Sequence, residues 1–323
     1  MNFVVTSSPH IRSKNNTNRI MLDVLIALLP ALIVGILRFG LGALTVSLVS
    51  VIAALTAEWI CSKIIFHRNT VADGSAAVTG LLLAMTLPAT VPYWIAALGS
   101  AFAIIIFKGL CGGLGRNIFN PALAARALLM MLWPSWLILY AAPGAVIPVM
   151  GSTVDVVTTA TPLHHMQMPA LPEVSVLDAF LGKTGGTIGE VCTLALLAGG
   201  AYLIYRGVIS VRIPGAYLGT VALLSLVFYK GEDPAAWMIY ILLSGGVVLG
   251  AFFMATDYAT SPVTAKGQLI YGIGCGALTV LFRYYGLFPE GVTYAILLMN
   301  AFAWAIDVHT APGCFGWKKG GTA

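Results

Sequence analysis

The chain has 323 residues, of which 59% are hydrophobic and only 9% are charged, whereas ordinary soluble domains are about 25% charged. Its formal net charge of +5 would suit nucleic acid in a soluble protein, but here the Lys and Arg residues lie at the ends of apolar runs, where they report membrane topology. This composition leaves no soluble domain of useful size, gives no support for nucleic-acid binding, and predicts an all-α integral membrane protein surrounded by lipid.

Residues 1–20 are polar and basic, and they lack the short apolar run and small-residue cleavage site of a signal peptide. We expect them to form a cytoplasmic lead-in. Ten apolar segments follow, most of them long enough to cross a hydrocarbon layer of about 30 Å as a helix. The predicted crossings are residues 21–39, 41–62, 75–90, 92–109, 118–140, 187–205, 213–229, 236–254, 267–284 and 291–309, followed by a tail at 310–323.

The longest connection, residues 141–186, divides the crossings into two halves of five helices, at 21–140 and 187–309. Threading the chain from a cytoplasmic N-terminus places most of its 17 Lys and Arg residues on the cytoplasmic side, as the positive-inside rule requires. The exceptions are Arg126 within the membrane and, on the outer side, Arg38, Lys183, Lys230 and Arg283. We therefore expect a multi-pass protein with both termini cytoplasmic and the 141–186 loop on the outer face.

The third crossing is short, begins with the polar sequence DGS and runs into Pro88. These features predict a broken or partly re-entrant helix, which a membrane protein tolerates only where the freed backbone groups are covered. The sequence DGSAAVTG from Asp73 also resembles DYATSPVTAKG from Asp257. An internal repeat with broken helices is one interpretation, and chance recurrence of small residues in membrane helices is the other.

Two polar stretches are candidates for binding sites. In DVVTTATPL, residues 155–163, threonine hydroxyls precede Pro162, which stops a helix, so they are accessible acceptors for a modifying enzyme. In CGGLGRNIFNPA, backbone N–H groups at a helix start and the charge of Arg116 suit an anionic or carbonyl-rich ligand such as a flavin ring. A locally hydrogen-bonded loop and close helix packing through small residues are the respective alternatives.

Carboxylates within a membrane are costly and therefore suspected of function. Asp73 and Asp257 rank first as parts of an ion path, because each adjoins a polar break whose carbonyls can coordinate a cation. A carboxylate near a helix end can instead simply reach the interface. The six ion-path candidates are Asp73, Asp257, Asp23, Glu58, Glu190 and Asp307. The five cysteines form no CxxC pair or zinc-like spacing with histidine, so we expect no metal site.

The spacing of Asp155, Thr158, Ala160 and Thr161 resembles the flavinylation motif, in which FMN is joined to the final threonine through a phosphoester bond. Thr159 stands where that motif often has glycine. Three further stretches, at 73–94, 108–129 and 250–272, occur in the same order on the same topology. Nearly the whole chain is thereby similar to the NqrB/RnfD family. This family comprises the D subunits of the Rnf complex, an ion-pumping ferredoxin:NAD oxidoreductase, and the B subunits of the sodium-pumping NADH:quinone oxidoreductase.

The resemblance implies that Thr161 carries covalent FMN, that Thr158 and Asp155 complete the motif, and that a separate flavin transferase makes the bond. It also implies partner subunits with iron–sulfur clusters, a second flavinylated subunit, and outward movement of Na+ or H+ across a bacterial inner membrane. A second, noncovalent flavin (riboflavin) is associated with the related quinone-reducing subunit. Its candidate contacts in this chain are Arg116, Asn117 and Asn120.

These observations predict an electron-relay subunit that is catalytically inert alone and works within an ion-translocating oxidoreductase. The chain lacks the cysteine runs of ferredoxins and a dinucleotide-binding fingerprint, so those functions must reside in partner subunits. A secondary transporter or channel without a redox centre is the competing hypothesis, and a structural membrane anchor is a third. A flavin-acceptor threonine separates the first hypothesis from the other two, and the short N-terminal region favours the Rnf type.

Overall fold

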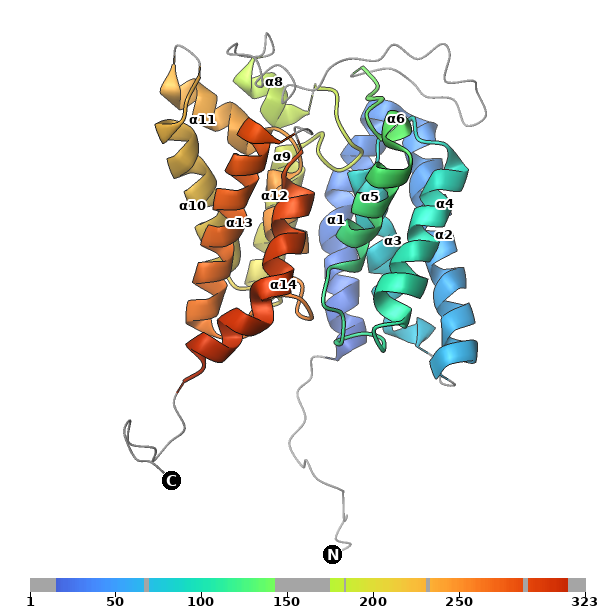
Figure 1. Ribbon diagram of the computed structural model, residues 1–323. Helices are drawn as coiled ribbons and strands as arrows, with labels where there is room; N and C mark the ends of the chain where they lie inside the picture. Colours follow the sequence, from blue (N-terminus) through green and yellow to red (C-terminus); the bar gives the residue numbers. More distant parts are fainter. Residues whose placement is uncertain are drawn as a thin grey trace, which may run out of the picture.

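A computed structural model of the chain describes residues 16–66, 70–142, 175–182, 184–230, 233–286 and 290–312. The regular elements of these residues are helices, which confirms the predicted all-α class. Figure 1 shows two neighbouring groups of upright helices, with α1 to α6 in blue to green and α8 to α14 in yellow-green to red. We call the end where α1 begins and α14 ends the proximal end, and the end that carries α6 and α8 the distal end.

The first half is built on α2, which packs against both α3 and α4. A π-helical segment, η3, continues α4 towards the proximal end. The elements are α1 (Thr17–Phe39), α2 (Leu41–Cys61), η1 (Ser62–Phe66), η2 (Val71–Asp73), α3 (Ser75–Thr86), α4 (Tyr93–Phe102), η3 (Ala103–Gly109), α5 (Pro121–Leu132) and α6 (Pro134–Leu137).

The second half is organised around α13, which packs against α10 and α14. Its α9 also packs against α1 of the first half, and this pair forms the main helical contact between the halves. The elements are α8 (Val176–Leu181), α9 (Thr193–Tyr205), α10 (Arg212–Val227), α11 (Pro234–Leu243), α12 (Val247–Leu249), η5 (Gly250–Met254), α13 (Ala265–Tyr285) and α14 (Val292–Thr310).

Among the described residues, four helices are long and apolar enough to cross a membrane, and α11 with α12 and η5 makes a fifth if that pair, bent by 61°, is one span. Five shorter apolar helices have 10–17 residues. Each predicted crossing overlaps one of these helices. A helix of that length, at 1.5 Å per residue, is nevertheless shorter than a hydrocarbon layer of about 30 Å. The helices therefore support a multi-pass membrane protein, while the count of ten crossings stays a prediction.

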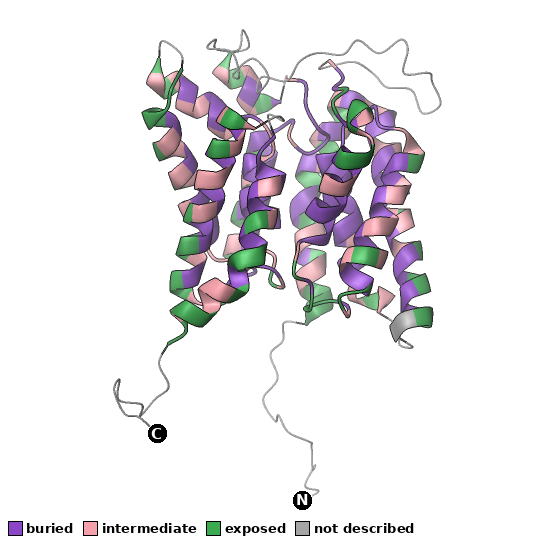
Figure 2. Cartoon of the chain, in the orientation of Figure 1, coloured by how far each residue is buried: buried purple, intermediate pink, exposed green. Residues whose placement is uncertain are grey.

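The outer surface of the bundle carries the large apolar side chains that a lipid environment requires. Leu37 of α1 is 78% exposed and Leu223 of α10 is 66% exposed. Figure 2 shows buried residues concentrated where the helices face one another. A soluble monomer rarely exposes such extensive apolar surface, so this pattern agrees with the composition.

In the first half a helix ends early, and in the second half a helix is broken by a bend. As predicted, α3 is short and ends before Pro88. The backbone carbonyls freed at its end accept hydrogen bonds from the second half, from Ile188 N–H to Leu87 (3.0 Å) and from Gly189 N–H to Met85 (2.8 Å). This break therefore lies where protein covers it, as a membrane interior demands.

The second interruption separates α11 from α12 at residues 244–246. Gly245 and Gly246 have φ values of 56° and 24°, a region that glycine tolerates best because it has no Cβ. The guanidinium of Arg283 fills this break, donating hydrogen bonds to the carbonyls of Ile241 (2.6 Å), Ser244 (2.7 Å) and Gly245 (2.7 Å). A charged side chain of α13 thus supplies hydrogen-bond donors to the free carbonyls at the end of α11.

The sequence counts Arg283 among the charges on the outer side, but its side chain is only 4% exposed and pairs with protein groups, so it is not a solvent-facing charge. Counting charges at helix ends cannot identify an arginine that pairs with the free carbonyls of another helix. Lys108, which the same count placed among the cytoplasmic charges, is 2% exposed. Both residues belong to the interior of the bundle.

Replacing Arg283 with leucine should destabilise the chain, because three carbonyls would lose their donors and each buried unpaired polar group costs about 1–3 kcal/mol. We expect a fall of several degrees in the thermal unfolding midpoint in detergent. Arg212→Gln is the matched control, since Arg212 is an exposed arginine at the start of α10. Equal midpoints for Arg283→Leu and Arg212→Gln would contradict this role.

Candidate functional site

A large cavity opens at the proximal end between the two halves. Its volume is about 690 Å³, within the range of about 300–1,000 Å³ that is usual for small-molecule sites. A smaller cavity of about 70 Å³ adjoins it and is lined by deeper residues of α3, η3, α5, α9 and η5. We call the two together the seam cavity. The residues that line both parts are Ile20, Met21, Leu114, Asn117, Asp257 and Tyr258.

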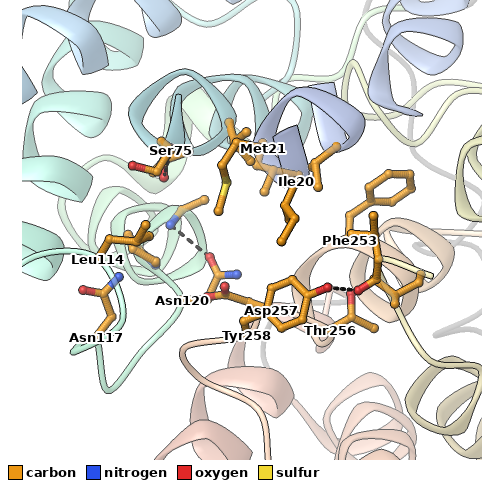
Figure 3. Close-up of a pocket in the computed structure, with 18 of the residues that line it drawn as sticks. Ile20, Met21, Ser75, Leu114, Asn117, Asn120, Phe253, Thr256, Asp257 and Tyr258 are labelled. Atoms are coloured by element: carbon orange, nitrogen blue, oxygen red, sulfur yellow. Dashed lines mark hydrogen bonds between the residues drawn. The ribbon is translucent and has the colours of Figure 1, made fainter. Parts of the chain in front are cut away.

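Three of the four stretches that carry the family resemblance meet at the seam cavity (Figure 3). Ser75 and Thr79 come from the DGSAAVTG stretch, and Asn117 comes from the glycine-rich stretch. Asp257 and Tyr258 follow η5 in the second half. The sequence identified these stretches separately, but their convergence on one site depends on how the halves pack together.

Asn117 is the polar residue whose surroundings most clearly demand a ligand. It is 6% exposed and lines both parts of the cavity. Its side-chain oxygen has no hydrogen-bond partner among the described residues. A buried acceptor without a partner costs about 1–3 kcal/mol of stability. We therefore expect this oxygen to accept a hydrogen bond from a bound molecule or a water.

Asn120 has a structural task at the same place. Its side-chain oxygen caps α5 by accepting hydrogen bonds from the N–H groups of Ala122 (3.1 Å) and Leu123 (3.3 Å). Its side-chain nitrogen donates to the carbonyl of Met254 (3.2 Å) in the other half. Asn120 therefore fixes the start of α5 to η5, with its oxygen serving as a helix N-cap.

Arg116 is exposed, and its side chain lies against Gly112. It is absent from the lining of either part of the seam cavity. Of the three candidate flavin contacts named from the sequence, Asn117 and Asn120 thus line the cavity, whereas Arg116 lies outside it.

Asp257 lies in the connection between η5 and α13, where it lines both parts of the cavity. Burial raises the pKa of its carboxyl above the usual value, because desolvation penalises the charged form; hydrogen bonds from Ala259 N–H and the Thr260 hydroxyl act in the opposite direction. The neighbouring Tyr258 hydroxyl donates to the carbonyl of Val208, which joins this connection to the end of α9.

A buried ion pair lies beside the inner part of the seam cavity. Lys108 Nζ is 2.9 Å from a carboxylate oxygen of Glu58, and these side chains are 2% and 1% exposed. Lys108 also donates to the Ser75 hydroxyl (2.6 Å), and Glu58 accepts from the Thr70 hydroxyl (2.7 Å). Asp73 accepts from Ser75 N–H (2.8 Å). Glu58 and Asp73, both ion-path candidates, therefore belong to one group of ion-paired and hydrogen-bonded side chains with Lys108, which sequence reasoning missed.

Two other ion-path candidates tie elements together at the proximal end. Asp23 of α1 pairs with Arg206 (3.1 Å) and accepts from the Tyr202 hydroxyl (3.0 Å), so it joins the two halves. Asp307 near the end of α14 accepts from the N–H groups of Val263 (3.0 Å) and Thr264 (3.3 Å) and lines the outer part of the cavity.

Glu190 is separate from the other five candidates and lies towards the distal end. It lines two small cavities with Glu290. Glu290 in turn pairs with Arg126 and accepts from the Tyr140 hydroxyl (2.6 Å). The sequence assigned Arg126 to the membrane but gave no signal of these partners, because residues 126 and 290 are far apart along the chain.

The flavinylation motif itself, with Asp155, Thr158 and Thr161, lies outside the described residues. Within the described ranges, no group of three or more His, Cys, Asp or Glu side chains could hold a metal ion. The site that the structure does describe is therefore the seam cavity, with one unpaired amide oxygen at its wall and a buried ion pair of which Lys108 lines the wall.

Comparison with known proteins shows a relationship along the whole chain. Residues 4–316 match the model of the NQR2, RnfD, RnfE family. The chain is 50% identical to the D subunit of the Na(+)-translocating ferredoxin:NAD(+) oxidoreductase complex of Acetobacterium woodii, covering 99% of this chain and 97% of that protein. It is 43% identical to the D subunit of the proton-translocating ferredoxin:NAD(+) oxidoreductase complex of Clostridium ljungdahlii, with coverage of 98% and 97%. It is 38% identical to the D subunit of the ion-translocating oxidoreductase complex of Stutzerimonas stutzeri, with coverage of 94% and 93%. The chain therefore belongs to the NQR2, RnfD, RnfE family.

Proposed function

We propose that this chain is the D subunit of an ion-translocating ferredoxin:NAD oxidoreductase complex of a bacterial inner membrane, in which it relays electrons. Its identity to the Acetobacterium and Clostridium proteins over nearly their full lengths supports this assignment. One of these relatives is named as Na+-translocating and the other as proton-translocating, so the proposal covers coupling to either ion. The other subunits would supply the iron–sulfur clusters and a second flavin-bearing chain.

The proposal includes ten crossings, with the proximal end in the cytoplasm. Following the helices in order brings the start of α1 and the end of α14 to this same end (Figure 1). The exposed basic residues Lys63, Arg212 and Lys266 lie near helix ends there, as the positive-inside rule requires of a cytoplasmic face. The 141–186 loop then belongs on the outer face.

The covalent part of the proposal rests on the sequence motif. Thr161 would carry FMN through a phosphoester bond, with Thr158 and Asp155 as the other motif residues, and a flavin transferase would attach it. A flavin exchanges one or two electrons with its neighbours, and its reduced ring is more negative than its oxidised ring. A tether keeps such a group at a high effective concentration beside its partners.

A second, noncovalent flavin such as riboflavin fits the seam cavity. The observation that carries this proposal is the Asn117 oxygen, an unpartnered buried acceptor at the wall of a cavity of about 690 Å³, which matches an imide N–H of a flat ring. Phe253 and Tyr258 supply aromatic surface in the lining. Asn120 would act by holding the start of α5 in place.

A secondary transporter or channel without a redox centre is the second candidate, because the first half has a helix that ends early and the second half has a broken helix, and many transporters contain discontinuous helices. In such proteins the freed backbone groups coordinate the transported ion. Here residues 188–189 cover one interruption and Arg283 fills the other. The described breaks therefore favour a structural role over ion coordination.

The covalent site can be tested with the denatured chain after co-expression with a flavin transferase. The wild-type chain should fluoresce in a gel and carry the added mass of one FMN less one water, and Thr161→Ala should lose both signals. Thr159→Ala is the control, because it leaves Asp155, Thr158 and Thr161 unchanged. A dark, unmodified wild-type chain beside an active transferase would support the transporter hypothesis.

The noncovalent site can be tested in the Thr161→Ala background, by measuring riboflavin binding to the purified full chain. Asn117→Leu should weaken binding by about tenfold or more, since a lost hydrogen bond in a buried site costs about 1–3 kcal/mol and about 1.4 kcal/mol is a factor of ten. Arg116→Gln changes the adjacent, exposed residue and should bind as the parent does. Equal affinities for both variants would exclude Asn117 as a contact.

A further inference from the structure

The inner wall of the seam cavity contains a positively charged residue, and its negatively charged partner lies behind it. Lys108 and Ser75 line the inner part of the cavity. Glu58, 2.9 Å from Lys108, lines neither part. The ion pair is therefore oriented, with Lys108 in the cavity wall and Glu58 behind it.

Lys108 has a hydrogen-bonding capacity that its described partners do not exhaust. An ammonium group carries three N–H donors. The Ser75 hydroxyl accepts one of them, and a Glu58 carboxylate oxygen lies 2.9 Å away as the ion-pair partner. Because Lys108 forms part of the cavity wall, we expect the remaining capacity to serve an acceptor atom of a bound molecule.

Apolar surroundings strengthen the effect of this charge. Ile20, Met21 and Leu114 also line the cavity, and Lys108 is only 2% exposed. Charges interact more strongly in such a medium than in water, because little solvent screens them. A change of charge on a molecule bound here would interact electrostatically with both members of the ion pair, and more strongly with Lys108, which is nearer to the cavity.

We propose that Lys108 contacts the noncovalent flavin and raises its midpoint potential by stabilising the reduced, more negative ring, while Glu58 moderates this effect from behind. The proposal rests on the noncovalent flavin site put forward above. The ammonium attracts the added negative charge, and the carboxylate repels it across a greater distance. The two charges shift the midpoint potential in opposite directions. In this role neither residue binds a transported ion.

The two residues should therefore change the potential in opposite directions. Lys108→Gln removes the attraction and leaves the Glu58 charge, so the midpoint potential should fall. Glu58→Gln removes the repulsion and leaves the ammonium, so the potential should rise. A purely structural pair would not give shifts of opposite sign. Lys63→Gln is the matched control, because Lys63 is an exposed lysine near the same end that lies outside the cavity lining.

The experiment uses the full chain in detergent in the Thr161→Ala background, loaded with riboflavin and titrated with dithionite while the flavin absorbance is recorded. Reduction and binding are thermodynamically linked. Each shift in midpoint potential therefore reports a change in the ratio of the affinities for reduced and oxidised riboflavin. A lower potential for Lys108→Gln, a higher one for Glu58→Gln and no change for Lys63→Gln would support the proposal. Shifts of the same sign, or no shift in either variant, would overturn it.

Two further outcomes are distinguishable. If Lys108→Gln loses riboflavin altogether, Glu58→Gln decides alone: a higher potential supports the proposal, and an unchanged or lower one overturns it. If the parent chain and Asn117→Leu both fail to bind riboflavin, the noncovalent site itself is wrong. Riboflavin bound by all variants at one common potential would instead leave the site intact and remove the role of Lys108.

Discussion

Backbone groups released where α3 ends early and where α11 breaks from α12 constrain this structure more than any other feature. Within a membrane, an unpaired carbonyl or N–H has no water to bond. At the end of α3 the second half supplies the partners, through Ile188 and Gly189. At the end of α11 the partner is Arg283. The first of these pairings ties the two halves together, and the second fixes α13 against α11 within the second half.

The seam cavity follows from the way the halves meet. At the proximal end, the connection before α5 and the connection before α13 come from different halves and face each other across the cavity. Asn120 bridges them by capping α5 and donating to Met254. Asp23 and Arg206 join α1 to the end of α9 nearby. The site is consequently a product of the interface between the halves, and each half contributes only part of its wall.

The sequence was sufficient for the helical class, the early end of α3 and the family, because hydropathy, a proline and ordered motifs act over short distances. It also identified Asn117 and Asp257 as residues of interest. It could not identify Lys108 as a cavity residue or Arg283 as the filling of a helix break, because both depend on partners on other helices. It included Arg116 because a charge beside a glycine-rich helix start looks like an anion site, whereas the structure turns this residue outwards.

We propose that this chain is a flavin-bearing relay with one tethered and one untethered flavin. The most direct measurement is to purify the full chain after co-expression with a flavin transferase, precipitate it with acid, and determine flavin in the pellet and the supernatant. We expect about one flavin per chain in each fraction, with FMN in the pellet and riboflavin in the supernatant. A folded chain that carries no flavin in either fraction, although the transferase is active, would contradict this proposal.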